Sequence, residues 1–374
     1  MFFLGSSVYV YLIGKKYYGI EAGWFAAIIY SIMPMNIFYT RTIMPESAAL
    51  FFFTGAFYYF IKWYDSEELR PLFTSAIFTA LSISQKTPTA FIGLAMIFLL
   101  IKKYRFKFLK KWKLWVFAFI TLAPNIMYFL WSRGIAKFDF VNKIVLLHII
   151  PNSAKAFLQK GNYKLAIIEI AAAISLGILP IVIIGILDIE WDRDHPILFW
   201  TIAMLIEVIA IASVIKLRYY FIFITPVAAL WAGKALGSFV KSKRSLVGVF
   251  LSLSIITFWN YILADCFFKE KDNILEQTAI IERYTNKDDL IIIGTQEPAL
   301  LNQSGRSGWR ANIRYYEGVP TDAVGEIQYY IDRGAKYFSP LGGTIFKDDG
   351  SYKKYLDENF ERLGNEEYYI YKLF

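Results

Sequence analysis

The chain has 374 residues, of which 56% are hydrophobic and 19% are charged. Soluble domains are usually about 45–50% apolar and about 25% charged, so this composition excludes a purely soluble enzyme, a disordered chain and a collagen-like fibre. The one cysteine, Cys266, excludes an internal disulfide framework. The formal net charge is +9, and its distribution between apolar segments decides whether it indicates nucleic-acid binding or membrane orientation.

About ten apolar runs, separated by short polar breaks, precede the last hundred or so residues, and each is a candidate for a membrane span of about 20 residues. They cover residues 1–14, 20–39, 47–63, 72–85, 88–101, 114–131, 164–187, 197–215, 221–240 and 245–264. The fourth and fifth runs are short, and the polar residues between them form either a loop or a kink. We therefore predict a mainly α-helical protein, with a polytopic transmembrane bundle of about ten spans in residues 1–265.

Basic residues concentrate in three breaks, which are 15–16, 102–113 and 241–244. Because cytoplasmic loops carry the excess of Lys and Arg, we place these breaks inside. The 102–113 cluster is therefore a topology signal rather than a nucleic-acid patch. The remaining breaks and the C-terminal tail then lie outside, in what we expect to be the plasma membrane.

Because successive breaks alternate between the two sides of the membrane, Met1 starts outside. It lies within an apolar run that has no signal-peptide pattern. We therefore expect at least one further span and an outer loop upstream of it.

Residues 266–374 differ in composition, because charges are frequent and apolar runs are of strand length. We predict a small extracytoplasmic α/β domain in which Gly305–Arg310 is a loop that packs its tryptophan. No glycine-rich phosphate motif is present, which argues against a nucleotide-sugar site. The expected strands are 289–294, 335–339 and 368–373, and the expected helices are 274–285, 321–334 (with Thr321 as N-cap) and 351–362.

Charged residues at a membrane surface are costly to bury and often mark function. Arg41 and Glu46 lie in one predicted outer loop. An arginine fork suits a phosphate, and a carboxylate suits a metal ion or a hydroxyl. A mutual salt bridge between Arg41 and Glu46 at a helix end is the structural alternative.

Two further outer breaks carry cations that the positive-inside rule does not explain. Lys86 is a candidate for binding a lipid phosphate, unless it only extends towards the interface. Arg218, followed by Tyr219, lies at the outer mouth of the eighth and ninth runs.

Two isolated polar residues suggest structural roles rather than chemistry. Glu207, near the middle of the eighth run, is expected to form a buried hydrogen bond. His148 stands among aliphatic residues in the long outer loop, which indicates packing rather than metal binding.

Together these segments resemble the GT-C superfamily of integral-membrane glycosyltransferases, in particular protein O-mannosyltransferases and lipid A aminoarabinose transferases. The resemblance rests on the order and sidedness of four short motifs. These are Leu12–Gly19, Phe38–Glu46 (with Glu where the family usually has Asp), Ser84–Pro88, and Arg218–Tyr220 followed by Pro226.

The resemblance implies transfer of a sugar from a polyprenyl-phosphate carrier to an acceptor, such as a lipid, glycan or protein, on the outer face. Substrate-binding roles fall on Arg41, Lys86, Arg218 and Tyr219, and Glu46 becomes a candidate catalytic residue and a ligand for a divalent metal ion. The family's general base lies in the first outer loop, which would precede Met1. We therefore predict a glycosyltransferase, with an inactive chain as the alternative because the acidic residue of that loop is absent.

Two other functional classes fit the same segments. A glycolipid transporter or flippase also carries charges within the membrane and helix breaks, although no inverted repeat is evident. A non-catalytic or truncated membrane subunit would account for the missing first loop.

Overall fold

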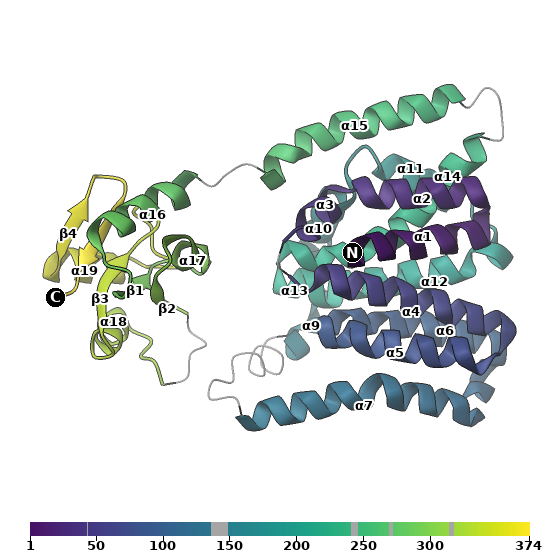
Figure 1. Ribbon diagram of the computed structural model, residues 1–374, viewed down its shortest axis with the longest axis horizontal. Coiled ribbons are helices and arrows are strands. Elements are labelled where there is room, and N and C mark those ends of the chain that lie inside the picture. Colours follow the sequence, from purple (N-terminus) through teal and green to yellow (C-terminus); the bar gives the residue numbers. More distant parts are fainter. Residues whose placement is uncertain (43, 136–148, 241–245, 269–271, 314–317) are drawn as a thin grey trace. The chain divides into compact units, whose positions relative to one another are not determined.

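The computed structural model describes residues 1–374 except 43, 136–148, 241–245, 269–271 and 314–317. The chain divides into two compact units (Figure 1): the described residues up to 268 form a helical unit, and those from 272 onward form an α/β unit. His148 and the basic break at 241–244 lie outside the described residues, so the expectations for them stay untested.

The helical unit is built almost entirely from helices joined by short connections. Its first part contains α1 (Phe2–Tyr18), α2 (Ile20–Ile32), α3 (Pro34–Tyr39), α4 (Glu46–Ser66), α5 (Leu69–Gln85), η1 (Thr87–Phe91), α6 (Ile92–Tyr104), η2 (Arg105–Lys110) and α7 (Trp112–Ile135). Its second part contains α9 (Ile150–Ala156), α10 (Lys160–Ile174), α11 (Leu179–Leu187), α12 (Trp191–Glu207), the π-helical turn η4 (Val208–Ala212), α13 (Ser213–Ile215), the 3₁₀ segment η5 (Arg218–Ile224), α14 (Thr225–Val240) and α15 (Leu246–Phe268).

Within the described residues, three helical stretches are long and apolar enough to cross a membrane: Trp112–Ile135, Trp191–Ile215 and Arg218–Val240. The predicted span at 164–187 is instead a pair of helices, α10 and α11, bent by 104°. Other predicted spans form helices of 13 to 17 residues, which are shorter than the roughly 20 residues that cross unaided. The count of about ten spans is therefore not confirmed.

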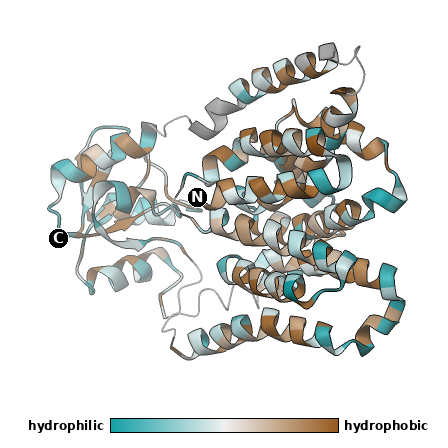
Figure 2. Cartoon of the chain, turned by 45° about the vertical axis from the view of Figure 1, so that its right-hand side comes forward, coloured by the Kyte–Doolittle hydropathy of each residue, from teal (hydrophilic) through white to brown (hydrophobic). Residues whose placement is uncertain are grey.

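Apolar residues dominate the helices of this unit, and hydrophilic residues gather near their ends (Figure 2). α4 has 21 residues and is about 30 Å long at a rise of 1.5 Å per residue. Glu46 begins it, and Glu67 follows its far end. Ion pairs from Lys16 to Asp65 and from Lys103 to Glu67 place two of the predicted inner breaks at that far end. Which membrane face this is stays a prediction.

Close backbone contact joins α2 to α14. A Cβ atom on Gly233 would lie 2.5 Å from the carbonyl oxygen of Ala22, and one on Gly237 would lie 2.7 Å from the Ala22 side chain. Glycines four residues apart allow such an approach, as is typical of packed membrane helices. α14 is consequently buried along most of its length, and it fixes the position of η5, which precedes it directly.

The second unit is a mixed five-stranded sheet with helices, in the strand order β2-β1-β3-β5-β4. β1 pairs in parallel with β2 and β3, and β5 pairs antiparallel with β3 and β4. The elements are α16 (Asp272–Tyr284), β1 (Leu290–Ile293), α17 (Ala299–Ser304), β2 (Ser307–Arg310), α18 (Ala323–Ile331), β3 (Ala335–Ser339), α19 (Ser351–Asn359), β4 (Glu361–Gly364) and β5 (Tyr369–Lys372).

The predicted strands correspond to β1, β3 and β5, and the three predicted helices are present. Two details were wrong. The N-cap of α18 is Asp322, whose side chain accepts from the Gly325 N–H, rather than Thr321. The expected loop at 305–310 contains the edge strand β2; its short, glycine-rich sequence resembles a turn, and pairing with β1 makes it a strand. Trp309 does pack, stacked on Tyr330 at 5.2 Å between ring centroids.

Candidate active site

Glu46 and Lys86 form a buried ion pair at one end of the helical unit. Glu46 is the first residue of α4 and is fully buried, and Lys86 lies at the break between α5 and η1. The Lys86 Nζ donates to Glu46 Oε1, and the two side chains are 11% and 0% exposed. The break at 85–88 is a single extended residue, Lys86, between the end of α5 at Gln85 and the start of η1 at Thr87. Glu46 Oε2 is buried and has no hydrogen-bond partner among the residues described.

Two aromatic rings hold the other side of the Lys86 ammonium group. Its Nζ lies 4.1 Å from the ring centroid of Tyr219 and 4.7 Å from that of Tyr220. Both tyrosines come from η5, at the start of the Arg218–Val240 stretch. A cation over an aromatic face is stabilised by the ring quadrupole, so these rings fix the ammonium group beside Glu46.

Arg218, the residue before these tyrosines, pairs with a carboxylate that the sequence analysis did not single out. Its Nε lies 3.3 Å from Oε2 of Glu169 on α10. The Arg218 side chain is 52% exposed, whereas Glu169 is 11% exposed. A lone carboxylate within an apolar run was the signal that identified Glu207, and the same signal at Glu169 was available in the run 164–187.

Tyr39, at the end of α3, packs against this site, with its ring 6.0 Å from that of Tyr219. The structure thus brings three predicted site residues (Lys86, Tyr219 and Glu46) into direct contact and places Arg218 next to them in the chain. We call this group the Glu46 cluster: Glu46, Lys86, Glu169, Arg218, Tyr219 and Tyr220.

Arg41 is exposed just beyond α3, and its backbone N–H donates to the Phe38 carbonyl oxygen at 3.2 Å. It was expected to support Glu46 or to form a salt bridge with it. Among the described residues, however, Lys86 is the cation paired with Glu46. Lys86 can reach Glu46 because α4 and α5 pack side by side, a contact between separate helices that sequence spacing does not reveal.

Glu207 departs from its expected structural role. It is 1% exposed at the end of α12, where the helix widens into the π-helical turn η4. Neither of its carboxylate oxygens has a hydrogen-bond partner in the part of the chain that is described. The predicted buried hydrogen bond is therefore not found.

A divalent metal ion at Glu46 is not confirmed by the described residues. No group of three or more His, Cys, Asp or Glu side chains with metal-binding geometry occurs among the described residues. Hard cations require several oxygen ligands, and an ammonium group already contacts Glu46. We therefore assign no metal to this cluster.

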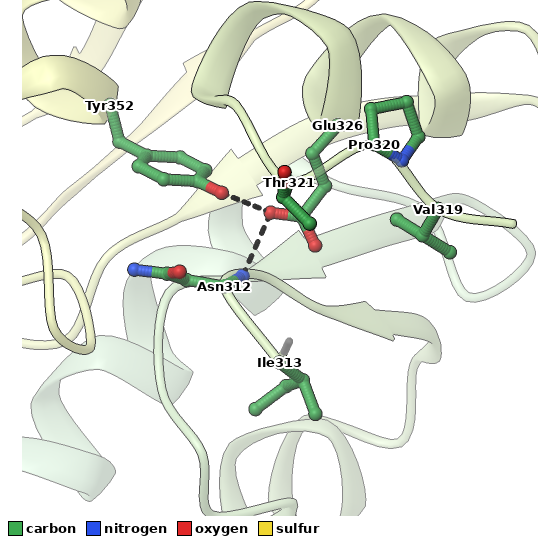
Figure 3. Close-up of a pocket in the computed structure, with 7 residues that line it drawn as sticks. All are labelled: Asn312, Ile313, Val319, Pro320, Thr321, Glu326 and Tyr352. Atoms are coloured by element: carbon green, nitrogen blue, oxygen red, sulfur yellow. Dashed lines mark hydrogen bonds between the residues drawn. The ribbon is translucent and has the colours of Figure 1, made fainter. Parts of the chain in front are cut away.

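The α/β unit also contains a deeply buried carboxylate, Glu326 on α18, which is 2% exposed (Figure 3). Its Oε2 accepts from the Tyr352 hydroxyl and, at 2.9 Å, from the Asn312 backbone N–H. Burial raises the pKa of Glu326, while these hydrogen bonds act in the opposite direction. The Tyr330 hydroxyl, on the same helix, donates to Oε1 at 3.5 Å. Since Tyr352 and Asn312 are neutral partners from two other segments, Glu326 cross-links the unit.

Comparison with known proteins gives one family and several structures. Residues 2–131, which include Arg41, Glu46 and Lys86 but not Arg218, match the family model described as dolichyl-phosphate-mannose-protein mannosyltransferase. ArnT from Cupriavidus metallidurans bound to undecaprenyl phosphate matches with a TM-score of 0.66 at 10% identity, covering 100% of this chain and 82% of that one. The predicted resemblance to the GT-C superfamily of membrane glycosyltransferases is confirmed.

Two further structures show the same GT-C fold. ArnT from the same organism in the apo state has a TM-score of 0.59 at 10% identity, over 100% of this chain and 82% of that one. The Archaeoglobus fulgidus oligosaccharyltransferase in complex with Zn and sulfate has a TM-score of 0.51 at 14% identity, over 98% of this chain and 60% of that one. No curated protein matches the chain.

Proposed function

We propose that this protein transfers a sugar from a polyprenyl-phosphate-linked donor to an acceptor on the outer face of the membrane. The observation that carries the proposal is the Glu46 cluster: two cations, Lys86 and Arg218, stand with two buried carboxylates at one end of a GT-C fold. A similar structure with this fold was solved with undecaprenyl phosphate bound, which supports a lipid phosphate as the ligand of such a unit.

Lys86 and Arg218 are suited to binding the donor phosphate. The ammonium group contacts Glu46 and two tyrosine rings, which hold it in place without using all three of its N–H donors. Arg218 contacts Glu169 through Nε and leaves its half-exposed guanidinium accessible. Fixed positive charge next to the leaving phosphate stabilises the negative charge that develops as the sugar departs.

In the proposed reaction, the acceptor hydroxyl oxygen forms a bond to the anomeric carbon and the bond from that carbon to the phosphate oxygen breaks. The polyprenyl phosphate leaves with the bonding electrons, and the hydroxyl proton passes to a carboxylate. Within the Glu46 cluster we assign this base role to Glu46, through the oxygen Oε2 that Lys86 does not occupy.

The test is a transfer assay on the full chain in proteoliposomes, with radiolabelled polyprenyl-phosphate mannose and other polyprenyl-phosphate hexoses as donors. A charge-assisted hydrogen bond is worth about 1.5–3 kcal/mol, so Arg218→Ala should lower kcat/KM by about 10- to 150-fold. Arg218→Lys should recover part of the rate, because a point charge replaces a bidentate fork.

Arg283→Ala, in the α/β unit, is the matched control and should leave transfer unchanged. Equal rates for the parent and a folded Arg218→Ala variant would remove the phosphate-binding role. Movement of the labelled glycolipid across the bilayer without sugar transfer would instead identify a flippase.

A further inference from the structure

A cavity of about 270 Å³ lies at the far end of α4, away from the Glu46 cluster. Trp63 and Glu67 line it from the end of α4, and three lysines line it from the end of η2 and the start of α7: Lys110, Lys111 and Lys113. We call it the Trp63 cavity. Its volume is slightly below the roughly 300–1,000 Å³ of pockets for drug-sized ligands, which suits a headgroup rather than a whole lipid or a sugar chain.

The lining carries more positive than negative charge. Glu67 is its one carboxylate, and the negative charge of this group is already balanced by its partners. Glu67 Oε1 accepts from the Tyr104 hydroxyl at 2.6 Å and lies 2.9 Å from the Lys103 Nζ. Hydrogen bonds from Tyr104 and Lys103 are the main cause that lowers the pKa of Glu67 to about 2. Lys111 lies 3.7 Å from Glu67 Oε2.

Lys110 and Lys113 remain as unneutralised charges on the cavity wall. Both are exposed, and no ion pair found within the described part of the chain involves either of them. Trp63 adds a hydrogen-bond donor: its side chain is 3% exposed, and its indole N–H is buried without a partner in the described structure. An unsatisfied buried N–H is unfavourable, and an acceptor that enters the cavity wall at Trp63 would relieve it.

Exposed aromatic side chains surround this end of the unit. Phe106, Trp112 and Trp115 are 74%, 64% and 61% exposed. Tryptophan prefers the level of the lipid headgroups, where its apolar ring and its N–H are both satisfied. These rings therefore indicate that the Trp63 cavity opens at the membrane interface. The positive-inside rule accounts for lysines at the end of η2 and the start of α7, but not for a cavity with a buried indole N–H.

We propose that the Trp63 cavity binds the anionic phosphate headgroup of a glycerophospholipid, in the leaflet opposite to the Glu46 cluster. Lys110 and Lys113 supply the charge, and Trp63 supplies a hydrogen-bond donor. This site does not depend on the transfer reaction, because it lies about 30 Å from Glu46 along α4 at 1.5 Å per residue. Its failure would leave the proposed glycosyl transfer untouched.

The experiment titrates the full chain in detergent with dioleoylphosphatidylglycerol or dioleoylphosphatidylcholine and counts bound lipid by native mass spectrometry. A Lys near an anionic headgroup contributes about 1 kcal/mol, so the double variant Lys110→Gln/Lys113→Gln should bind phosphatidylglycerol about tenfold or more weakly. The matched control Lys62→Gln/Lys107→Gln removes two exposed lysines at the same end that do not line the cavity. This control should change the affinity for phosphatidylglycerol by less than about threefold, because salt screens the attraction between exposed lysines and a lipid bound elsewhere.

Trp63→Phe distinguishes specific binding in the cavity from non-specific attraction to surface charge, because it removes the indole N–H and retains an aromatic ring. A hydrogen bond has a net worth of about 0.5–1.5 kcal/mol, so we expect about two- to tenfold weaker phosphatidylglycerol binding. Equal binding of both lipids, or equal losses in the two double variants, would overturn the proposal. Displacement of phosphatidylglycerol by millimolar inorganic phosphate would identify a free-anion site and would also overturn it.

Discussion

Glu46 in the helical unit and Glu326 in the α/β unit are both buried carboxylates, and they are satisfied in different ways. Glu46 contacts an ammonium ion and keeps one oxygen without a partner among the described residues. Glu326 accepts from a hydroxyl and a backbone N–H. A cation paired with a carboxylate can move to a substrate phosphate and so release the carboxylate, whereas a carboxylate satisfied by neutral donors has no such cation to release. Burial alone therefore does not distinguish these two carboxylates, whereas the charge of the partner does.

The largest expected effect comes from removing the charge on Glu46. General-base catalysis contributes about 10²- to 10⁴-fold, so Glu46→Gln should lower the transfer rate by that factor. Glu326→Gln is the matched control in the other unit, and it should leave initial rates unchanged. Comparable losses in both variants would mean that the two carboxylates do not differ in the way that their partners suggest.

Breaking the ion pair from the other side should lower stability in addition to any effect on donor binding. Lys86→Met leaves Glu46 buried without its cation, and such changes cost about 3–5 kcal/mol. Chemical unfolding in detergent measures the loss. Adding Glu46→Gln to Lys86→Met should restore part of the stability, because the double variant no longer buries an unpaired charge. If the double variant is as unstable as the sum of the two single variants, the pair is not coupled.

A smaller effect is expected from the ring beneath Lys86. A cation–π contact is worth about 0.5–2 kcal/mol, so Tyr219→Ala should raise the KM for the donor by about 2- to 30-fold. Tyr219→Phe retains the ring and should behave like the parent. A loss in Tyr219→Phe as large as that in Tyr219→Ala would assign the role to the hydroxyl instead.

The smallest effect concerns the pH dependence of the α/β unit. Burial raises the pKa of Glu326 in the folded state, so folding takes up protons at this site. The resulting stabilisation is complete below the unfolded pKa of about 4.3 and is lost as the pH rises through the folded value. Hydrogen exchange of α18 in the full chain, corrected for the intrinsic rate, should report decreasing protection over that range. Glu326→Gln should flatten the dependence, and an unchanged pH profile in this variant would contradict the assignment.

Several features followed from the sequence because they depend on local chemistry. The strands β1, β3 and β5 are short apolar or alternating runs, and such runs are predictable from period and composition. The candidate cations Lys86 and Arg218 were found because charge at the end of an apolar helix is costly wherever the helix packs. The same reasoning identified Glu46.

Other features depended on contacts between distant segments. Lys86 rather than Arg41 pairs with Glu46, because the packing of α5 against α4 brings residues 40 positions apart together. Glu169 joins the site through Arg218 from a different helix. The edge strand β2 exists because β1 offers it hydrogen bonds, which its own glycine-rich sequence does not indicate.

The amino-acid sequence by itself determined a helical, membrane-type first unit, an α/β second unit and the charged residues worth testing. These properties follow from the hydrophobicity and period of each segment, which act over a few residues. The tertiary structure alone decided which charges meet, because Coulombic pairing depends on distance in space. It also decided that Glu207 lacks a hydrogen-bond partner within the described residues. Burial depends on which helices surround a side chain, and no local pattern records that.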